Sequence, residues 1–199
     1  MDLTDTVLLC VDLQNDLVLG EGKLGGSGLS DQVDARDLLA IVRTVQDAVR
    51  AAGGGVAHVR VTYRSDYRDN ACVSQRAQRL KDAGAFIEDT WGSNIHDLVA
   101  PLEDEMIFTK HAVNPFFNTG LMTWLNSRRA RRVILCVVAT NMVAESAARY
   151  ADDAGFHVTL VEDACASFRN DSHEFTVNLI LPLLGRVVYS AELIKEISE

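Results

Sequence analysis

The sequence predicts an α/β fold: a doubly wound, mostly parallel six-stranded sheet with helices on both faces, in three layers. Six short runs rich in aliphatic residues recur along the chain, and most are separated by segments with helical spacing of apolar side chains. The longer runs lack polar alternation, as is typical of parallel strands covered on both faces. With 199 residues and 48% hydrophobic content, the chain can bury one substantial core, so we expect a single domain over residues 1–199.

The N-terminal elements show this pattern most clearly. Residues 6–11 are aliphatic or β-branched apart from one cysteine, and they predict a buried, central strand. The glycine-rich residues 20–28 predict a loop at the edge of a site. Apolar side chains then recur at helical spacing over residues 33–52, and three glycines at 53–55 end that helix. The second strand is expected at residues 55–62.

The same alternation continues to the C-terminal end. The remaining predicted elements are strands at 105–109, 132–138, 156–161 and 186–188 and helices at 119–128, 141–154 and 172–184. Between residues 63 and 103 the pattern blurs into a long excursion. Such an excursion over the strand ends is where we expect substrate selectivity to be determined.

Charge and composition exclude several classes of partner. A net charge of −9 and a pI near 5.0 argue against nucleic acid, because phosphate backbones are bound by clustered Lys and Arg. No apolar stretch is long enough to span a bilayer, and the acidic N-terminus is unlike a secretory signal, so we expect no membrane and a cytoplasmic location. The four cysteines lack metal-ligand spacing and are expected to be free thiols in a reducing compartment.

Three residues that can carry chemistry follow predicted strands: Asp12, Lys110 and Ala139. Open α/β sheets bind ligands beyond the carboxyl ends of their strands, so these positions should converge. A carboxylate beside an ammonium stays ionised at rest, whereas burial and substrate binding can move a proton onto the acid. We therefore predict Asp12 and Lys110 as catalytic residues.

Three motifs in this order resemble the isochorismatase-like hydrolases, also called the cysteine hydrolase superfamily: VDLQND at 11–16, FTK at 108–110 and VVATNMVAESAAR at 137–149. The resemblance covers nearly the whole chain, since further matching segments occur at 91–96, 114–119 and 163–173. It implies an isochorismatase-like, Rossmann-like three-layer fold, a homo-oligomer (dimer or tetramer) and a small-molecule substrate.

The resemblance also gives roles at the third motif, where Val143 occupies the position of the family's nucleophilic cysteine. It implies that the Val138–Ala139 peptide is cis and that the amides of Ala139 and Val143 form an oxyanion hole. Valine offers no nucleophile, so the chain is identified as a member lacking that cysteine. Cys136, within an apolar run, is expected to point into a helix layer.

Three functions remain open. The first is a hydrolase that uses Asp12 as general acid and Lys110 as orienting cation on a small anionic or enol-ether substrate, as true isochorismatases do without a thiol. The second is a catalytically silent homologue that binds a metabolite or a partner, and the third is an amide hydrolase that activates water directly. A pocket plugged by Val143, Met142 or Phe116 would favour the silent homologue.

Substrate contacts are expected from side chains near the strand ends: Gln14, Tyr63, Arg64, Trp91, Phe116 and Thr140. No metal and no cofactor are expected. The histidines are scattered along the sequence, without the close spacing of a metal-binding group.

Overall fold

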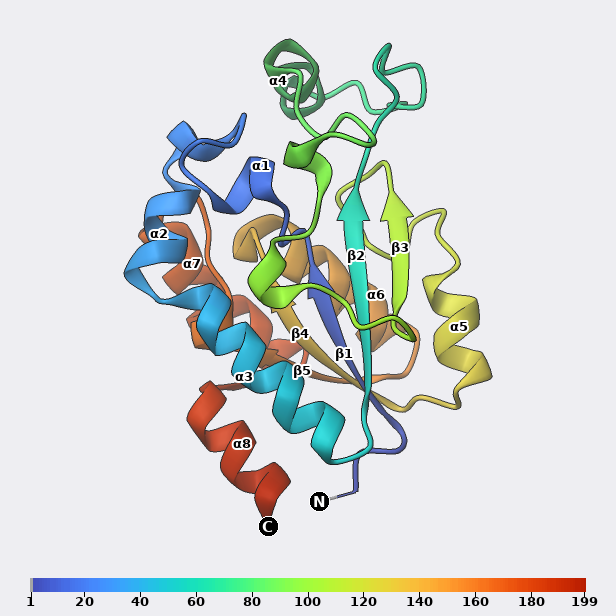
Figure 1. Ribbon diagram of the computed structural model, residues 1–199. Helices are drawn as coiled ribbons and strands as arrows, with labels where there is room; N and C mark the ends of the chain where they lie inside the picture. The colour runs from blue at the N-terminus through green and yellow to red at the C-terminus, as the bar shows by residue number, and fades with distance from the viewer. Residues whose placement is uncertain (1) are drawn as a thin grey trace.

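A six-stranded, all-parallel sheet forms the centre of the computed structural model, which describes residues 2–199 (Figure 1). The strand order is β3-β2-β1-β4-β5-β6, and this confirms the predicted fold class. The strands are β1 (Thr6–Val11), β2 (Gly55–Val61), β3 (Met106–Lys110), β4 (Arg132–Val137), β5 (His157–Val161) and β6 (Arg186–Val188).

The central strand β1 is buried along its whole length, between β2 and β4. Its side chains alternate between two hydrophobic clusters. Val7, Leu9 and Val11 belong to one cluster, and Leu8 and Cys10 belong to the other. Both faces of the sheet are therefore covered, which is why the strand sequence shows no polar alternation.

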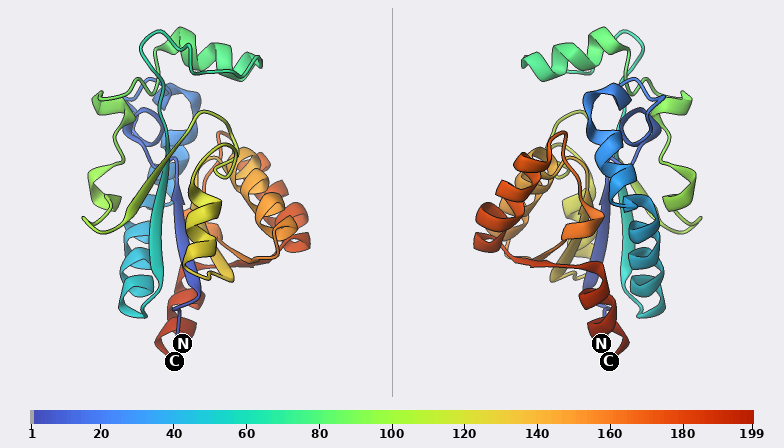
Figure 2. Two further views of the ribbon diagram at one scale, coloured as in Figure 1. Left: turned by 90° about the vertical axis from the view of Figure 1, so that its right-hand side faces the viewer. Right: turned by 90° about the vertical axis from the view of Figure 1, so that its left-hand side faces the viewer.

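Helices cover the two faces in separate layers. They are α1 (Asn15–Val18), α2 (Leu29–Ala35), α3 (Leu38–Ala51), α4 (Gln75–Ala83), α5 (Leu121–Ser127), α6 (Glu145–Asp153), α7 (Asn170–Phe175) and α8 (Ser190–Ser198). Figure 2 shows α3 on one side of the sheet and α5 and α6 on the other. The apolar side chains of α3 and α8 join the cluster that contains Leu8 and Cys10, whereas those of α5 and α6 join the cluster that contains Val7, Leu9 and Val11.

The helices differ from the prediction in several places. The helix expected over 33–52 is two helices, because Asp37 adopts a left-handed backbone with φ 51° between α2 and α3. The helix expected over 172–184 is α7 followed by a π-helical turn (Thr176–Ile180) and a 3-10 turn (Leu181–Leu183). Three helices, α1, α4 and α8, were not predicted. Within residues 2–199, no helix has the length and apolar character needed to cross a membrane.

The strand order reverses direction between β1 and β4, which are neighbours in the sheet although far apart in sequence. In doubly wound sheets, the crevice outside the carboxyl ends of the strands at such a reversal is the usual ligand site. The residues that follow β1 and β4 are therefore in the position where chemistry is expected.

Candidate functional site

Asp12 and Lys110 form a buried ion pair at the carboxyl edge of the sheet. Asp12 follows β1, and Lys110 ends β3, two strands away in the sheet. The Lys110 Nζ lies 2.7 Å from Asp12 Oδ2, with 1% and 7% of the respective side chains exposed. The ammonium also donates a hydrogen bond to the Val113 carbonyl at 2.8 Å. The expected proximity of these two residues is met.

Burial acts in opposite senses on the two partners. It raises the pKa of the Asp12 carboxyl, against the opposing effects of the charge and hydrogen bond of Lys110. It lowers the pKa of the Lys110 ammonium, against the opposing effect of Asp12. In both groups, burial acts in favour of the neutral form, and the charge of the partner acts in favour of the ionised form.

The second carboxylate oxygen of Asp12, Oδ1, is buried and has no hydrogen-bond partner among residues 2–199. A buried oxygen without a partner is costly and calls for an explanation. Asp12 also has a left-handed backbone, with φ 61°. Aspartate tolerates this region better than most residues, but such backbones are concentrated at functional sites.

A cavity of about 90 Å³ borders this ion pair. Its walls include Met142 and Val143 from the segment after β4, Phe168 from the segment after β5, and Leu24 from the glycine-rich loop. At roughly 30 Å³ per water molecule, the volume holds about three waters. The cavity is mostly apolar apart from Asp12, Lys110 and one further cation.

That further cation is Arg76 near the start of α4, which the sequence analysis missed. Figure 1 shows α4 beyond the carboxyl end of β2, and Arg76 lines the cavity. Ser74 caps the helix by accepting a hydrogen bond from the Ala77 N–H at 3.3 Å. Arg76 makes no ion pair with an acidic side chain in the described part of the chain. In the sequence, the signal for this helix was Ser74, a helix-capping residue directly before the segment QRAQRL.

The turn after β4 reaches the cavity as expected. The Val138–Ala139 peptide is cis, and Ala139, Met142 and Val143 line the cavity. The Val143 N–H, however, donates to the Ala139 carbonyl at 2.8 Å. A substrate oxygen would therefore have to share that amide with the turn itself.

None of the six residues expected to contact substrate lines the cavity. Three of them are buried in structural contacts. The Gln14 side-chain amide donates to the Val61 carbonyl at 2.7 Å and accepts from the Val61 N–H at 2.8 Å. Tyr63 is buried, with its hydroxyl 3.4 Å from the His111 carbonyl. Thr140 is buried and bonded to a histidine.

The other three point elsewhere. Arg64 is exposed and pairs with Asp66 at 3.2 Å. Trp91 is 51% exposed. Phe116 is buried and stacks on Tyr150, with ring centroids 4.8 Å apart. Within this cavity, then, the polar contacts available to a ligand come from Asp12, Lys110 and Arg76 and from the backbone.

No cysteine of the described chain lines the cavity. Cys10, Cys136 and Cys165 are buried, and Cys72 is partly buried. Cys136 belongs to the same hydrophobic cluster as α3, so it points into a helix layer as predicted. Burial raises the pKa of all three buried thiols, that of Cys10 to about 12.

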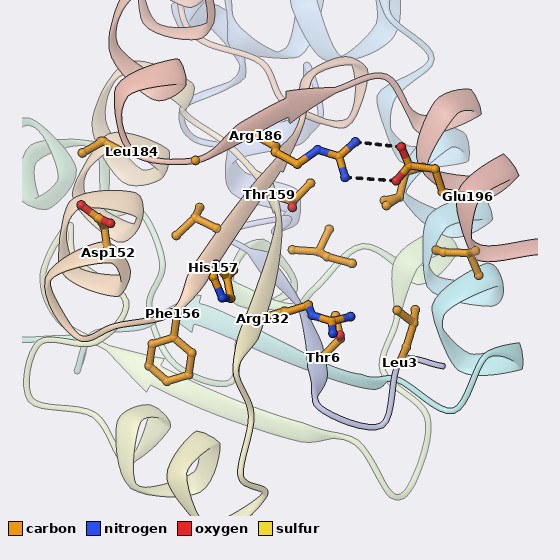
Figure 3. A pocket seen from close by; sticks show the side chains of 15 residues that line it. Leu3, Thr6, Arg132, Asp152, Phe156, His157, Thr159, Leu184, Arg186 and Glu196 are labelled. Carbon is orange, nitrogen blue, oxygen red and sulfur yellow. Dashed lines mark hydrogen bonds and ion pairs between the residues drawn. The ribbon is translucent and has the colours of Figure 1, made fainter. Parts of the chain in front are cut away.

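A larger hollow, of about 520 Å³, lies at the other end of the sheet (Figure 3). It is lined by the first residues of four strands: Thr6, Arg132, His157 and Arg186. Arg186 is already paired with Glu196 at 2.8 Å. Because ligands of open α/β sheets bind at the carboxyl ends, the smaller cavity beside Asp12 is the candidate site. Residues 2–199 contain no group of three or more His, Cys, Asp or Glu side chains arranged to hold a metal ion.

Known proteins are similar to this chain in sequence and in fold. A model of the isochorismatase domain matches residues 6–192. The uncharacterized isochorismatase family protein YecD of Escherichia coli O157:H7 is 28% identical, over 92% of this chain and 90% of its own length. The ureidoacrylate amidohydrolase RutB of Agrobacterium fabrum is 26% identical, over 81% of this chain and 75% of its own. The structure of a cysteine hydrolase from Pseudomonas syringae pv. phaseolicola has the same fold, with a TM-score of 0.88, 22% identity, and coverage of 100% of this chain and 94% of that one.

Proposed function

The chain belongs to the isochorismatase family, and from this premise we propose that it hydrolyses a small anionic or enol-ether substrate through Asp12 and Lys110, without a cysteine nucleophile. One observation carries the proposal. Asp12 has one oxygen paired with Lys110 and the other without a partner, and the residue borders the cavity. A carboxyl group in this state can deliver a proton to a bound substrate.

Acid catalysis on an enol ether uses this arrangement directly. Protonated Asp12 transfers its proton to the terminal carbon of the C=C bond, which forms a C–H bond and leaves an oxocarbenium ion. Water adds to that cation and returns a proton to the Asp12 carboxylate. The resulting hemiketal then breaks its C–O bond to give a ketone and an alcohol. Lys110 holds the carboxylate in place and stabilises its charge between turnovers.

Two features support chemistry without a thiol. Val143 stands where the family resemblance implies the attacking cysteine, and its side chain lines the cavity. The buried cysteines lie in the core with raised pKa values, which disfavours the reactive thiolate.

The charges around the cavity support an anionic substrate. The site carries one negative group, Asp12, and two positive groups, Lys110 and Arg76. Lys110 is paired with Asp12, so Arg76 is left to bind a carboxylate. The small volume favours a compact substrate, and a larger one requires the walls at Leu24 and Met142 to move.

Two other functions remain to be separated by experiment. Direct amide hydrolysis is favoured by the likeness to ureidoacrylate amidohydrolases. A silent homologue was expected to have a plugged pocket. The cavity remains open beside Met142 and Val143, while Phe116 packs away from it, and this supports a site that admits a ligand.

The test is turnover of isochorismate and of ureidoacrylate by the purified protein. We expect hydrolysis of the enol ether and its loss in Asp12→Asn, which keeps the shape of the side chain but cannot donate an acid proton. The matched control is Asp31→Asn, an exposed position in α2, which should keep full activity. Hydrolysis of the amide alone would favour the amidase, and no turnover of either compound would favour the silent homologue.

A further inference from the structure

A chain of buried hydrogen bonds runs from the turn after β4 to the surface of the molecule. The Thr140 hydroxyl lies 2.8 Å from His173 Nδ1, and His173 Nε2 lies 2.8 Å from Glu162 Oε1. Arg36, at the end of α2, donates to the same carboxylate oxygen at 3.1 Å. Thr140 and His173 are almost completely buried, with 0% and 1% exposure. No step of the proposed reaction uses these four side chains.

The groups bonded to His173 determine which atom donates in these hydrogen bonds. His173 and Arg36 hold the pKa of the Glu162 carboxyl below its usual range, so this group is an acceptor only. The Nε2–H of His173 therefore donates to Glu162. In the neutral form of the imidazole, Nδ1 is an acceptor and the Thr140 O–H donates to it; in the cationic form, Nδ1–H donates to the Thr140 oxygen. The threonine side chain is thus held in a single rotamer.

Further hydrogen bonds hold the same turn at neighbouring points. The Thr140 N–H donates to the Ala166 carbonyl at 2.8 Å. The Ser167 hydroxyl donates to the Asn141 side-chain oxygen. The turn is therefore joined through side chains and backbone to the segment that follows β5.

Both of the joined segments form walls of the cavity. On one side of the contact, Thr140 lies between Ala139 and Val143, which line the cavity. On the other side, Ser167 precedes Phe168, which also lines it. A substitution at His173 can therefore shift the cavity wall, although His173 itself does not line the cavity.

We propose that Thr140, His173 and Glu162 are positioning residues that hold the turn at residues 139–143 against the segment at 166–168. Their effect is to fix where the backbone and side chains of the turn face Asp12 and Lys110. The role of this positioning in substrate binding and catalysis rests on the proposed function. The geometry itself can be measured without any substrate.

The measurement uses a thiol introduced by Val143→Cys as a reporter at the cavity wall. In this background, the rate of alkylation by iodoacetamide at that position is followed by mass spectrometry as a function of pH. The turn places the new thiol at the start of a helical segment beside Lys110, so it should react faster than Cys72 of the same protein. Adding Thr140→Val removes the hydroxyl with little change of shape and should slow the reaction roughly tenfold, which corresponds to about 1.4 kcal/mol.

Thr140→Ser retains the hydroxyl and should restore most of the rate. The matched control is Thr159→Val, the same chemical change on β5 outside the cavity, which should leave the rate within about twofold. If Thr140→Val unfolds the protein, His173→Gln interrupts the chain from its other side, and the same loss is expected.

Two outcomes overturn the proposal: alkylation in Thr140→Val or His173→Gln within about twofold of the Val143→Cys parent, or a parent thiol no more reactive than Cys72. Neither outcome depends on turnover. Failure of the proposed function appears separately, in the substrate assay on Asp12→Asn.

Discussion

Replacing Lys110 by methionine tests how much the ion pair between Lys110 and Asp12 contributes to the free energy of unfolding. Methionine approximates the length of the lysine side chain but removes its charge, which leaves Asp12 buried with both oxygens unpaired. Breaking one side of a buried pair typically costs about 3 to 5 kcal/mol, because the remaining charge is neither solvated nor compensated. We expect Lys110→Met to lower the free energy of unfolding by that amount near pH 8.

The pH dependence follows from the same argument. Burial already raises the pKa of Asp12, and loss of the ammonium removes the group that opposes this rise. The folded state of the variant therefore binds a proton more tightly than the unfolded state. The difference in free energy of unfolding between the parent and Lys110→Met should therefore shrink as the pH falls through the pKa of Asp12 in the folded variant.

Urea denaturation of parent and variant at a series of pH values measures this deficit. The double variant Asp12→Asn/Lys110→Met removes both charges and should recover much of the loss. Lys23→Met, at an exposed position, should change stability by no more than about 0.5 kcal/mol. A deficit below about 1 kcal/mol that does not vary with pH would refute the reasoning.

Further predictions concern other parts of the chain. Burial lowers the pKa of His58 to about 4, against the opposing effect of Glu105, whose Oε2 lies 3.5 Å from His58 Nε2, so stability should fall by about 3 kcal/mol between pH 6.5 and 4. His58→Phe should remove this loss of stability at low pH. If urea denaturation shows the same dependence of the free energy of unfolding on pH in this variant, the loss does not come from His58. In the native protein, iodoacetamide should modify Cys72 before the three buried cysteines, and mass spectrometry that finds all four equally modified would disprove their burial. Arg76→Gln should raise the KM for an anionic substrate about tenfold with a smaller change in kcat, while Arg79→Gln, exposed on the same helix, should leave both unchanged.

The strands were predictable because burial on both faces leaves a clear mark on sequence. The runs at β1 and β4 contain aliphatic residues or cysteine wherever a side chain meets a helix layer, and the predicted ends of both strands agree with the structure to within one residue. Helix α4 leaves no such mark. Only Ala77 and Leu80 of its nine residues are buried, so its sequence shows no apolar stripe, and Arg76 was missed with it.

The candidate site likewise has residues that the sequence predicts and residues that it does not. Asp12 and Lys110 were predictable because topology brings the carboxyl ends of parallel strands to one edge. The residues expected to contact substrate depended on side-chain direction, which tertiary hydrogen bonds decide. Gln14 lies only two residues after Asp12, yet its amide pairs with the backbone of Val61 and does not reach the cavity. No local pattern in the sequence encodes that choice.

The most direct test of hydrolysis through Asp12 without a thiol is steady-state turnover by a chain in which all four cysteines are replaced. Alanine or serine at those positions removes every thiol and leaves the Asp12–Lys110 pair untouched. Assayed beside Asp12→Asn on the same substrate, the cysteine-free chain should retain the kcat of the parent to within about threefold, whereas Asp12→Asn should lose at least about a hundredfold. A folded cysteine-free chain without activity, beside an active Asp12→Asn, would contradict the account.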